Sequence, residues 1–193
     1  MIRLDRVSFS YGEKQMMHDF SLSIEKENVL CLFGESGCGK TTVLRLLLGL
    51  EKPDSGNIYG IGKWKAAAVF QEDRLLPFWS LQKNIALTAT DAGAAEENMK
   101  ALGLLEVKDK AISSLSGGMK RRAAIARALA AEFDYLILDE PFTGLDDENI
   151  RRAAAHIRAV AKDRPIVMVT HSESEIAYMG AKKIIMPGGM GNR

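Results

Sequence analysis

Three things are scarce in this 193-residue sequence: cysteine, net charge and long hydrophobic runs. The two cysteines, Cys31 and Cys38, have no partner at metal-ligand spacing, so we expect a core thiol and a loop thiol, and neither a zinc site nor a disulfide. Lysine and arginine number 26 against 25 acidic residues, and a net charge of +1 argues against the basic surface of nucleic-acid-binding proteins. We therefore expect no nucleic-acid partner.

The sequence also lacks targeting and membrane signals. Residues 1–6 contain no apolar signal region, and no run approaches the roughly 18 apolar residues that a membrane-spanning helix needs. Because reduced cysteines also suit the cytosol, we expect a soluble cytosolic chain. The hydrophobic content of 47% is enough for one well-filled core, so we expect a single domain, and there is no internal repeat.

The central motif of the chain is a glycine loop between an apolar strand and a helix, in residues 29–48. It has the spacing Gly34-x4-Gly39-Lys40-Thr41, which is that of a phosphate-binding P-loop. In such a loop the backbone N–H groups turn toward the phosphates, and the start of the helix adds positive potential. Lys40 is expected to reach the β- and γ-phosphates and Thr41 to hold Mg²⁺. A plain glycine turn is the alternative interpretation.

Hydrophobic periodicity predicts the other elements. Alternating residues predict two half-buried strands, at 2–9 and 20–24, joined near a turn at 11–14, and a second turn is predicted at 53–56. Apolar runs predict further strands at 29–33, 66–70, 135–138, 166–169 and 183–186. Helices are predicted at 43–48, 120–131, 149–161 and 174–179.

These elements predict an α/β fold of the P-loop NTPase type, with a mainly parallel sheet and a small antiparallel β element. The whole chain, residues 1–193, is expected to be one domain. Its core comprises residues 1–73 and 133–193, and residues from about 74 to 132 form an inserted helical subdomain. The glycine-rich end is expected to be frayed.

Polar groups follow four of the predicted buried strands. They are the P-loop, Gln71, the pair Asp139 and Glu140, and His171. Ligands of open parallel sheets lie beyond the carboxyl ends of the strands, so we expect these groups to share one site. Asp139 is expected on the Mg²⁺ side, acting through a water, and Glu140 is free to orient or deprotonate the attacking water.

Each of these residues also has a simpler interpretation. Asp139 and Glu140 could cap the turn before a proline, and Gln71 could be an ordinary loop amide. His171 could be a histidine with a structural role, and Tyr11 could be either a solvent-facing turn aromatic or a platform on which a base stacks. Their convergence at one sheet edge favours the functional interpretation.

Taken in order, the motifs resemble those of the ATP-binding cassette (ABC) ATPases. The resemblance covers the chain from Tyr11 to His171. The motifs that carry it are the P-loop, Leu115-Ser116-Gly117-Gly118, Asp139-Glu140, Gly144-Leu145-Asp146 and His171.

The resemblance implies that the chain binds ATP and Mg²⁺ and is an ATPase. Tyr11 would stack on adenine, Glu140 would be the catalytic base and His171 would contact the γ-phosphate. Gln71 would lie near the metal and the attacking water, so the metal would be held by Thr41, Gln71 and Asp139. The phosphate-binding residues would be Gly34, Glu35, Ser36, Gly37, Cys38, Gly39, Lys40, Thr41 and Thr42.

The resemblance also implies partners. Ser116, Gly117 and Gly118 would act on the ATP of the opposite subunit, in a head-to-tail dimer that sandwiches two ATP molecules. The second subunit would be another copy or a homologous ATPase subunit. The transmembrane permease subunits would be separate chains, because this chain has no span, and it would lie on the inner face of the cell membrane.

Some residues depart from the common family pattern. Met119 stands where the family most often has Gln, a variant that also appears in its nitrate, sulfonate and taurine importer branch, which residues 69–77 resemble as well. The stretch from Lys40 to Gln71 is shorter than is common, which puts the antiparallel sheet in doubt. The chain ends soon after its last predicted strand, so we expect no regulatory C-terminal domain.

The resulting prediction is the ATPase subunit of an importer of a small anionic or organic solute. Alternatives are the ATPase of an exporter or of a non-transport assembly complex, although the tandem cassettes or coiled coils of such complexes are missing. A third possibility is a small kinase or GTPase, although this sequence lacks the Asn-Lys-x-Asp element that binds guanine.

Residues 75–79 are five consecutive apolar residues that follow Gln71 closely. They could form a buried hinge of the helical subdomain. We expect instead that Phe78 or Trp79 stays exposed, because exposed aromatic residues mark protein interfaces. The family resemblance implies that a coupling helix of the membrane subunit docks beside this segment.

Overall fold

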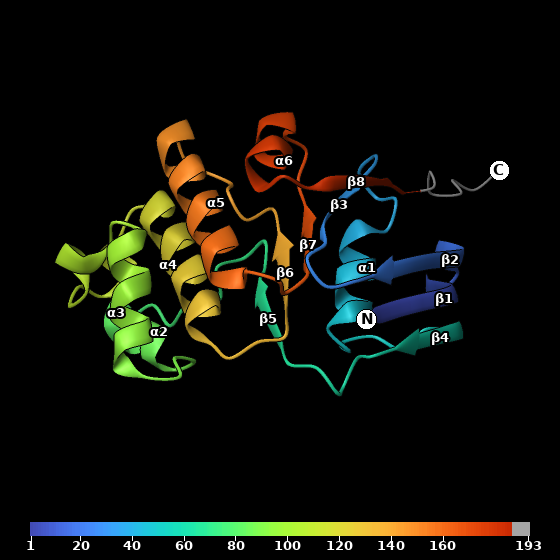
Figure 1. Ribbon diagram of the computed structural model, residues 1–193, viewed down its shortest axis with the longest axis horizontal. Coiled ribbons are helices and arrows are strands. Elements are labelled where there is room, and N and C mark those ends of the chain that lie inside the picture. Colours follow the sequence, from blue (N-terminus) through green and yellow to red (C-terminus); the bar gives the residue numbers. More distant parts are fainter. Residues whose placement is uncertain (187–193) are drawn as a thin grey trace.

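The computed structural model describes residues 1–186, which form two sheets with helices on both sides of the larger one (Figure 1). The strands are β1 (Ile2–Tyr11), β2 (Lys14–Ile24), β3 (Val29–Phe33), β4 (Ser55–Tyr59), β5 (Ala66–Val69), β6 (Tyr135–Asp139), β7 (Ile166–Val169) and β8 (Lys182–Ile185). The α-helices are α1 (Lys40–Leu47), α2 (Leu81–Ala86), α3 (Ala92–Ala101), α4 (Gly117–Ala130), α5 (Asp147–Ala161) and α6 (Glu173–Met179). Two 3₁₀ helices, Leu105–Val107 and Ile112–Ser114, lie between α3 and α4. The predicted frayed end, Gly188–Arg193, falls outside the described residues.

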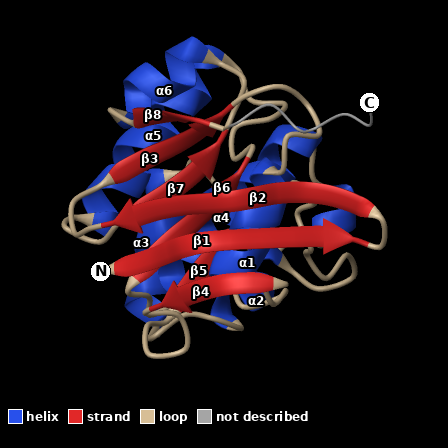
Figure 2. Cartoon of the chain, turned by 90° about the vertical axis from the view of Figure 1, so that its right-hand side faces the viewer, coloured by secondary structure: helices blue, strands red, loops and turns tan. Residues whose placement is uncertain are grey.

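The smaller sheet is antiparallel, in the order β2-β1-β4, and its strands cross one face of the molecule in Figure 2. The predicted pair β1 and β2 is confirmed, and the sheet that the short stretch before Gln71 put in doubt is present. The prediction of a turn at 53–56 is wrong in part, because Ser55 and Gly56 begin β4. Gly56 has φ +82°, and a Cβ there would lie 2.2 Å from the carbonyl oxygen of Arg6. This glycine therefore allows the close approach of two strands.

The larger sheet is parallel, in the order β5-β6-β7-β3-β8, as predicted. Alternate residues of its strands point to opposite faces and enter two hydrophobic clusters. Leu32 and Ile137 pack with α1 and the antiparallel sheet, whereas Cys31 and Leu138 pack with the helices on the other face. Figure 1 accordingly shows α1 between the two sheets, with α4, α5 and α6 beyond the parallel sheet.

Two helices begin earlier than their periodicity predicts, because side chains cap them. The Ser116 hydroxyl accepts a hydrogen bond from the Met119 N–H at 3.3 Å, so α4 begins at Gly117 and not at residue 120. The Asp146 carboxylate accepts from the Asn149 N–H at 2.9 Å and starts α5 at residue 147. Both caps are side chains of the type that helix N-termini prefer.

The segment predicted as a helical subdomain contains α2, α3, the two 3₁₀ helices and α4. Its buried side chains, among them Leu81, Ile85 and Met99, belong to the same hydrophobic cluster as Leu136 and Met168 of the sheet. Among residues 1–186, the structure contains no helix with the length and apolar character that a membrane span requires.

Candidate active site

The register of the parallel sheet brings the predicted polar groups to one edge. Asp139 is paired with Val169, Val169 is paired with Leu32, and Val69 is paired with Leu138. The residues that follow these four strands therefore lie side by side, at the carboxyl edge where ligands of parallel sheets bind. The structure thus brings together the P-loop, Gln71, the acidic pair and His171.

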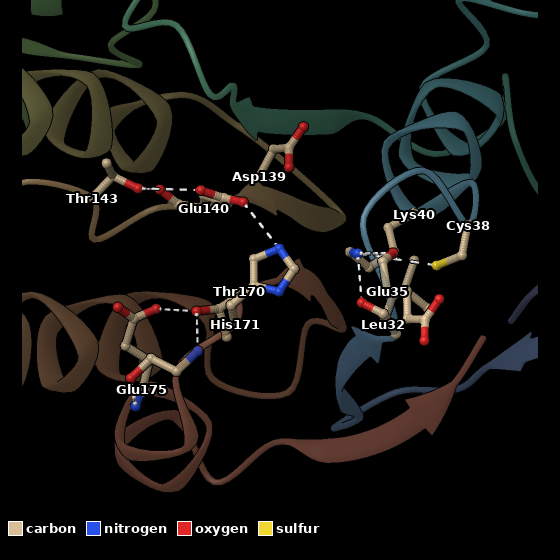
Figure 3. Close-up of polar contacts among 12 residues, drawn as sticks. Leu32, Glu35, Cys38, Lys40, Asp139, Glu140, Thr143, Thr170, His171 and Glu175 are labelled. Atoms are coloured by element: carbon tan, nitrogen blue, oxygen red, sulfur yellow. Dashed lines mark hydrogen bonds and ion pairs between the residues drawn. The ribbon is translucent and has the colours of Figure 1, made fainter. Parts of the chain in front are cut away.

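The P-loop wraps around the Lys40 side chain (Figure 3). Lys40 is buried, with 6% of the residue exposed, and its ammonium donates hydrogen bonds to the carbonyl oxygens of Gly34 and Glu35, both at 2.8 Å. Its Nζ atom also lies 4.0 Å from the Cys38 sulfur. The loop therefore holds a positive charge at its centre, within reach of an anion bound by the surrounding N–H groups.

The shape of the loop depends on residues that the spacing pattern selected. Gly39 precedes α1 with φ +96°, and a Cβ there would lie 3.0 Å from the carbonyl oxygen of Met16 on β2. Cys38 is a loop residue as predicted, but its side chain is buried against Gly34. The antiparallel sheet therefore forms part of the wall behind the loop.

The residues predicted to hold Mg²⁺ line one small pocket. Thr41, Gln71 and Asp139 line a volume of about 140 Å³, at the junction of α1 with the ends of β5 and β6, together with Arg45, Arg74 and several apolar side chains. Hydroxyl, amide and carboxylate oxygens are ligands that suit Mg²⁺. Asp139 is buried, whereas Thr41 is exposed at the pocket mouth.

Burial raises the pKa of the Asp139 carboxyl above its ordinary value. The hydroxyl of Thr41 opposes this shift, the negative charge of Glu140 adds to it, and the charges of Arg121 and Lys40 oppose it. A cation that binds beside this buried carboxylate would stabilise its ionised form. The donor set and the buried carboxylate both fit a divalent metal ion.

Glu140 and His171 face each other across the edge of the sheet (Figure 3). Their Oε1 and Nε2 atoms are 3.5 Å apart, and the side chains are 30% and 55% exposed. The backbone of Glu140 has φ +47°, a conformation that residues with a Cβ rarely adopt. Such strain is typical of functional positions whose surroundings hold the backbone in place.

The residue before His171 is anchored by a small hydrogen-bond network. The hydroxyl of Thr170 donates to the Glu175 carboxylate on α6 and accepts from the Ser172 N–H at 3.1 Å. Burial raises the pKa of Glu175, and the charge of Glu140 raises it further. These contacts fix the turn that carries His171, and nothing in the sequence pattern pointed to Thr170 or Glu175.

Tyr11 ends β1 and stays 44% exposed. Its ring meets Phe9 edge to face, with the centroids 4.8 Å apart, and its hydroxyl donates to the Glu51 carboxylate at 3.3 Å. Glu51 in turn pairs with Arg45 of α1 at 2.9 Å. The aromatic face is therefore held beside the α1 layer, and the role of Tyr11 in stacking on a base stays a prediction.

Ser116, Gly117 and Gly118 form the N-terminus of α4. Ser116 and Gly117 are exposed, and Gly118 lies against Gly144 and Leu145. The exposed N–H groups at this helix start suit an anion. Their action on the ATP of a second subunit stays a prediction.

Two arginines on α4 contact the site although the motifs did not select them. Arg121 bonds to backbone oxygens after β5 and β6, and Arg127 donates to the carbonyl oxygens of Arg74 at 2.8 Å and Asp73 at 3.2 Å. Arg121 lies on the same helix face as the buried residues Ala124 and Ile125. A charged residue on the apolar face of a helix is the signal that could have found it.

Part of the apolar row at residues 75–79 is exposed, as expected, whereas Leu75 is half-buried against the core. Phe78 is 88% exposed and Trp79 is 45% exposed. The turn that carries them is held by the fully buried Asn84, whose side chain accepts from the Leu76 N–H at 2.7 Å and donates to the Leu76 and Ser80 carbonyls. The interpretation of this row as a buried hinge is therefore wrong.

Comparison with known proteins gives one family. A family model described as ABC transporter matches residues 17–143. The chain is 38% identical to the aliphatic sulfonates import ATP-binding protein SsuB 3 of Paraburkholderia xenovorans, over 93% of this chain and 74% of that protein. It is 31% identical to the taurine import ATP-binding protein TauB of Pseudomonas aeruginosa, over 95% of this chain and 78% of that one. It is 34% identical to the nitrate import ATP-binding protein NrtD of Synechococcus elongatus, over 92% and 72%.

The fold has a close match among solved structures. A dimeric structure of a bacterial ABC transporter cassette superimposes with a TM-score of 0.86 at 25% identity, over 96% of this chain and 94% of that chain. The parallel sheet, the antiparallel sheet and the helical segment of the present chain therefore form an arrangement that is also found in a solved cassette.

Replacement of Asp139 tests the electrostatics of the pocket. Because its folded-state pKa is raised, ionised Asp139 costs stability, and this cost grows as the pH rises from about 3.9, the ordinary value for Asp, through the raised pKa. We expect Asp139→Asn to raise the Tm of the nucleotide-free protein at pH 8, by about 2–4 °C for each kcal/mol of this stability cost that the substitution removes. The gain should shrink toward pH 4, as followed by differential scanning fluorimetry.

Asp146→Asn is the matched control. Hydrogen bonds from Asn149 lower the pKa of this exposed carboxyl, so its ionised form contributes stability above about pH 3.9, and its replacement should not raise the Tm. An unchanged or lower Tm for Asp139→Asn at pH 8 would contradict the assignment of a costly buried charge.

Proposed function

We propose that this chain, which belongs to the ABC transporter family, is the ATP-binding and hydrolysing subunit of a membrane importer for a small anionic or organic solute. The observation that carries this proposal is the convergence of Lys40, Asp139, Glu140 and His171 at one sheet edge. Relatives named as import ATP-binding proteins for sulfonates, taurine and nitrate support the choice of an importer.

The chain is an ATPase, and we assign the following roles to its residues. The loop N–H groups and Lys40 hold the phosphates together with Thr42, which is buried. Tyr11 stacks on the adenine. Gln71 orients the water that attacks the γ-phosphate.

Mg²⁺ is proposed at the pocket formed by Thr41, Gln71 and Asp139. Its charge would neutralise the phosphate oxygens and ionise Asp139 fully. This proposal is supported by the hydroxyl, amide and carboxylate oxygens of these three residues and by the raised pKa of the buried carboxyl.

Glu140 is proposed as the general base. It is less than one third exposed and faces His171 at 3.5 Å, so it can accept the proton of a water molecule at the edge of the sheet. His171 would then contact the γ-phosphate, while Lys40 offsets the negative charge that spreads over the transferred group. These roles follow the chemistry of each group and its place at the edge.

Two copies are proposed to assemble head to tail around two ATP molecules. The exposed start of α4, with Ser116 as its N-cap, would bind the γ-phosphate of the partner subunit's ATP through its N–H groups. A dimeric solved cassette of the same fold supports this arrangement. The assembled pair would work on the inner face of the membrane with permease subunits on separate chains.

The dimer predicts an ATP-dependent change of mass. Glu140→Gln should lower kcat at least about 100-fold, because the amide accepts no proton, while ATP binding persists. ATP and Mg²⁺ should therefore convert this variant from monomer to dimer in size-exclusion chromatography with light scattering. Adding Ser116→Arg should abolish the dimer, because the side chain would block the phosphate position at the helix start.

Ser113→Arg, in the Glu140→Gln background, is the matched control, since Ser113 is an exposed serine three residues earlier. It should leave the ATP-dependent dimer intact. A dimer that forms without ATP, or that survives Ser116→Arg, would count against the sandwich.

The exposed row after Gln71 is proposed as the docking site of the permease. Phe78 and Trp79 provide aromatic anchors on a turn that is fixed by Asn84. An apolar groove of about 790 Å³ lies between the end of α1, the free edge of β5 and α4, and Phe70 lines both this groove and the Mg²⁺ pocket. A membrane segment seated here would contact the wall of the nucleotide site.

Single replacements Phe78→Ser and Trp79→Ser test this docking. Both side chains are exposed, so we expect melting temperatures and basal ATPase activity near those of the unmodified protein. Co-purification with the co-expressed permease subunits of its own transporter should fall at least about tenfold, because each aromatic anchor contributes on the order of 2 kcal/mol.

Ile185→Ser is the control for loss of an exposed apolar residue, since Ile185 is 69% exposed on β8, at the opposite edge of the sheet. It should co-purify normally. Normal co-purification of both aromatic variants, or a large loss of thermal stability in both, would remove this docking assignment.

A further inference from the structure

A single buried guanidinium joins three segments of the site. Arg121 is 3% exposed and lies one turn into α4. It donates to the carbonyl oxygens of Phe70 at 2.6 Å, Gln71 at 3.3 Å, Asp139 at 2.9 Å and Pro141 at 3.0 Å, to the carbonyl of Glu140, and to the Asp73 carboxylate at 3.2 Å.

These acceptors belong to two turns that are far apart in sequence. Phe70, Gln71 and Asp73 follow β5, whereas Asp139 is the last residue of β6 and Glu140 follows it. The planar guanidinium presents five N–H donors in a rigid fork, so its orientation fixes both turns relative to α4. An ammonium on a flexible stem could satisfy only part of this set.

The contact with Glu140 matters most for geometry. Glu140 has φ +47°, and its carbonyl accepts from Arg121 while its N–H donates to the carbonyl of Val169 at 2.9 Å. The backbone of Glu140 is thus held from two sides in a conformation that it would not favour alone. The direction of the Glu140 carboxylate depends on that backbone.

We propose that Arg121 is a positioning residue for ATP hydrolysis: it holds the Glu140 turn and the Gln71 turn in the geometry that hydrolysis needs. This inference rests on the proposed role of Glu140 as base. Because Arg121 also belongs to the helix that begins at Ser116, it joins the start of α4 to both turns.

The test measures steady-state ATP hydrolysis by the full chain with Mg²⁺, for Arg121→Lys and Arg121→Gln. We expect kcat to fall about 10–100-fold, as is common when groups that orient catalytic residues are lost, with KM for ATP changed by less than about twofold. Lys should retain more activity than Gln, because it keeps the charge and some of the donors.

A second measurement separates positioning from a general structural effect. If Arg121 acts through Glu140, Arg121→Lys should lower the residual turnover of Glu140→Gln by a clearly smaller factor than it lowers kcat of the unmodified protein, since coupled residues are non-additive. Arg164→Lys is the matched control, because the Arg164 guanidinium likewise binds carbonyl oxygens, of Ala161 and Phe133, at the start of β7 away from the site. It should leave kcat within about twofold of the unmodified value.

Several outcomes would overturn the inference. One is that Arg121→Lys lowers turnover by the same factor in the unmodified protein and in Glu140→Gln. Another is that the Arg121 variants keep an unchanged kcat, with or without a raised KM for ATP. Failure of both Arg121 variants to melt cooperatively would mean that Arg121 only stabilises the fold. If the unmodified chain hydrolysed no ATP, the proposed function would fail first and this inference with it, whereas activity that is lost in Glu140→Gln would uphold the function whatever Arg121 does.

Discussion

The parallel register of β5, β6, β7 and β3 is the constraint on which the rest of the site depends. Because hydrogen bonding aligns these strands, they end at nearly the same level, and the residues that follow them lie close together at one edge. A shift of one residue in a single strand would turn its side chains to the other face and carry its terminal polar group away from the edge. The two hydrophobic clusters oppose that shift, because alternate residues such as Cys31 and Leu32 are buried on opposite faces.

The sequence predicted the parts of the structure that local patterns encode. The glycine spacing of the P-loop, the apolar strands and the polar residue after each strand indicated the sheet and its edge, and all the predicted strands are present. The prediction missed β4, since Gly56 also fits a turn, and only the approach of the Arg6 carbonyl shows why a glycine is needed there. It placed the start of α4 three residues late, because Ser116 acts as a cap before the periodic residues begin.

Contacts between distant segments could not be predicted in this way. Arg121 binds backbone oxygens of turns that only the folded chain brings near, and a sequence pattern does not reveal which backbone carbonyls act as acceptors. Asn84 and Thr170 bind backbone groups only eight and two residues away, and hydrophobic periodicity does not report such local bonds either. The charge of Arg121 on an apolar helix face was a signal, but it did not identify the partners. Only the folded chain shows which residues support the site. Arg121 of α4 bonds to the turns after β5 and β6, and Phe70 lines both the Mg²⁺ pocket and the apolar groove.

The central claim is that one sheet edge binds ATP with Mg²⁺ and that a second copy completes the site. Hydrogen–deuterium exchange of the Glu140→Gln protein, with and without ATP and Mg²⁺, tests it most directly. The account predicts joint protection of residues 34–42, 70–73, 139–143 and 170–172, together with residues 116–118 that a partner copy covers. Protection confined to the P-loop, with the other strand ends and the start of α4 unchanged, would contradict it.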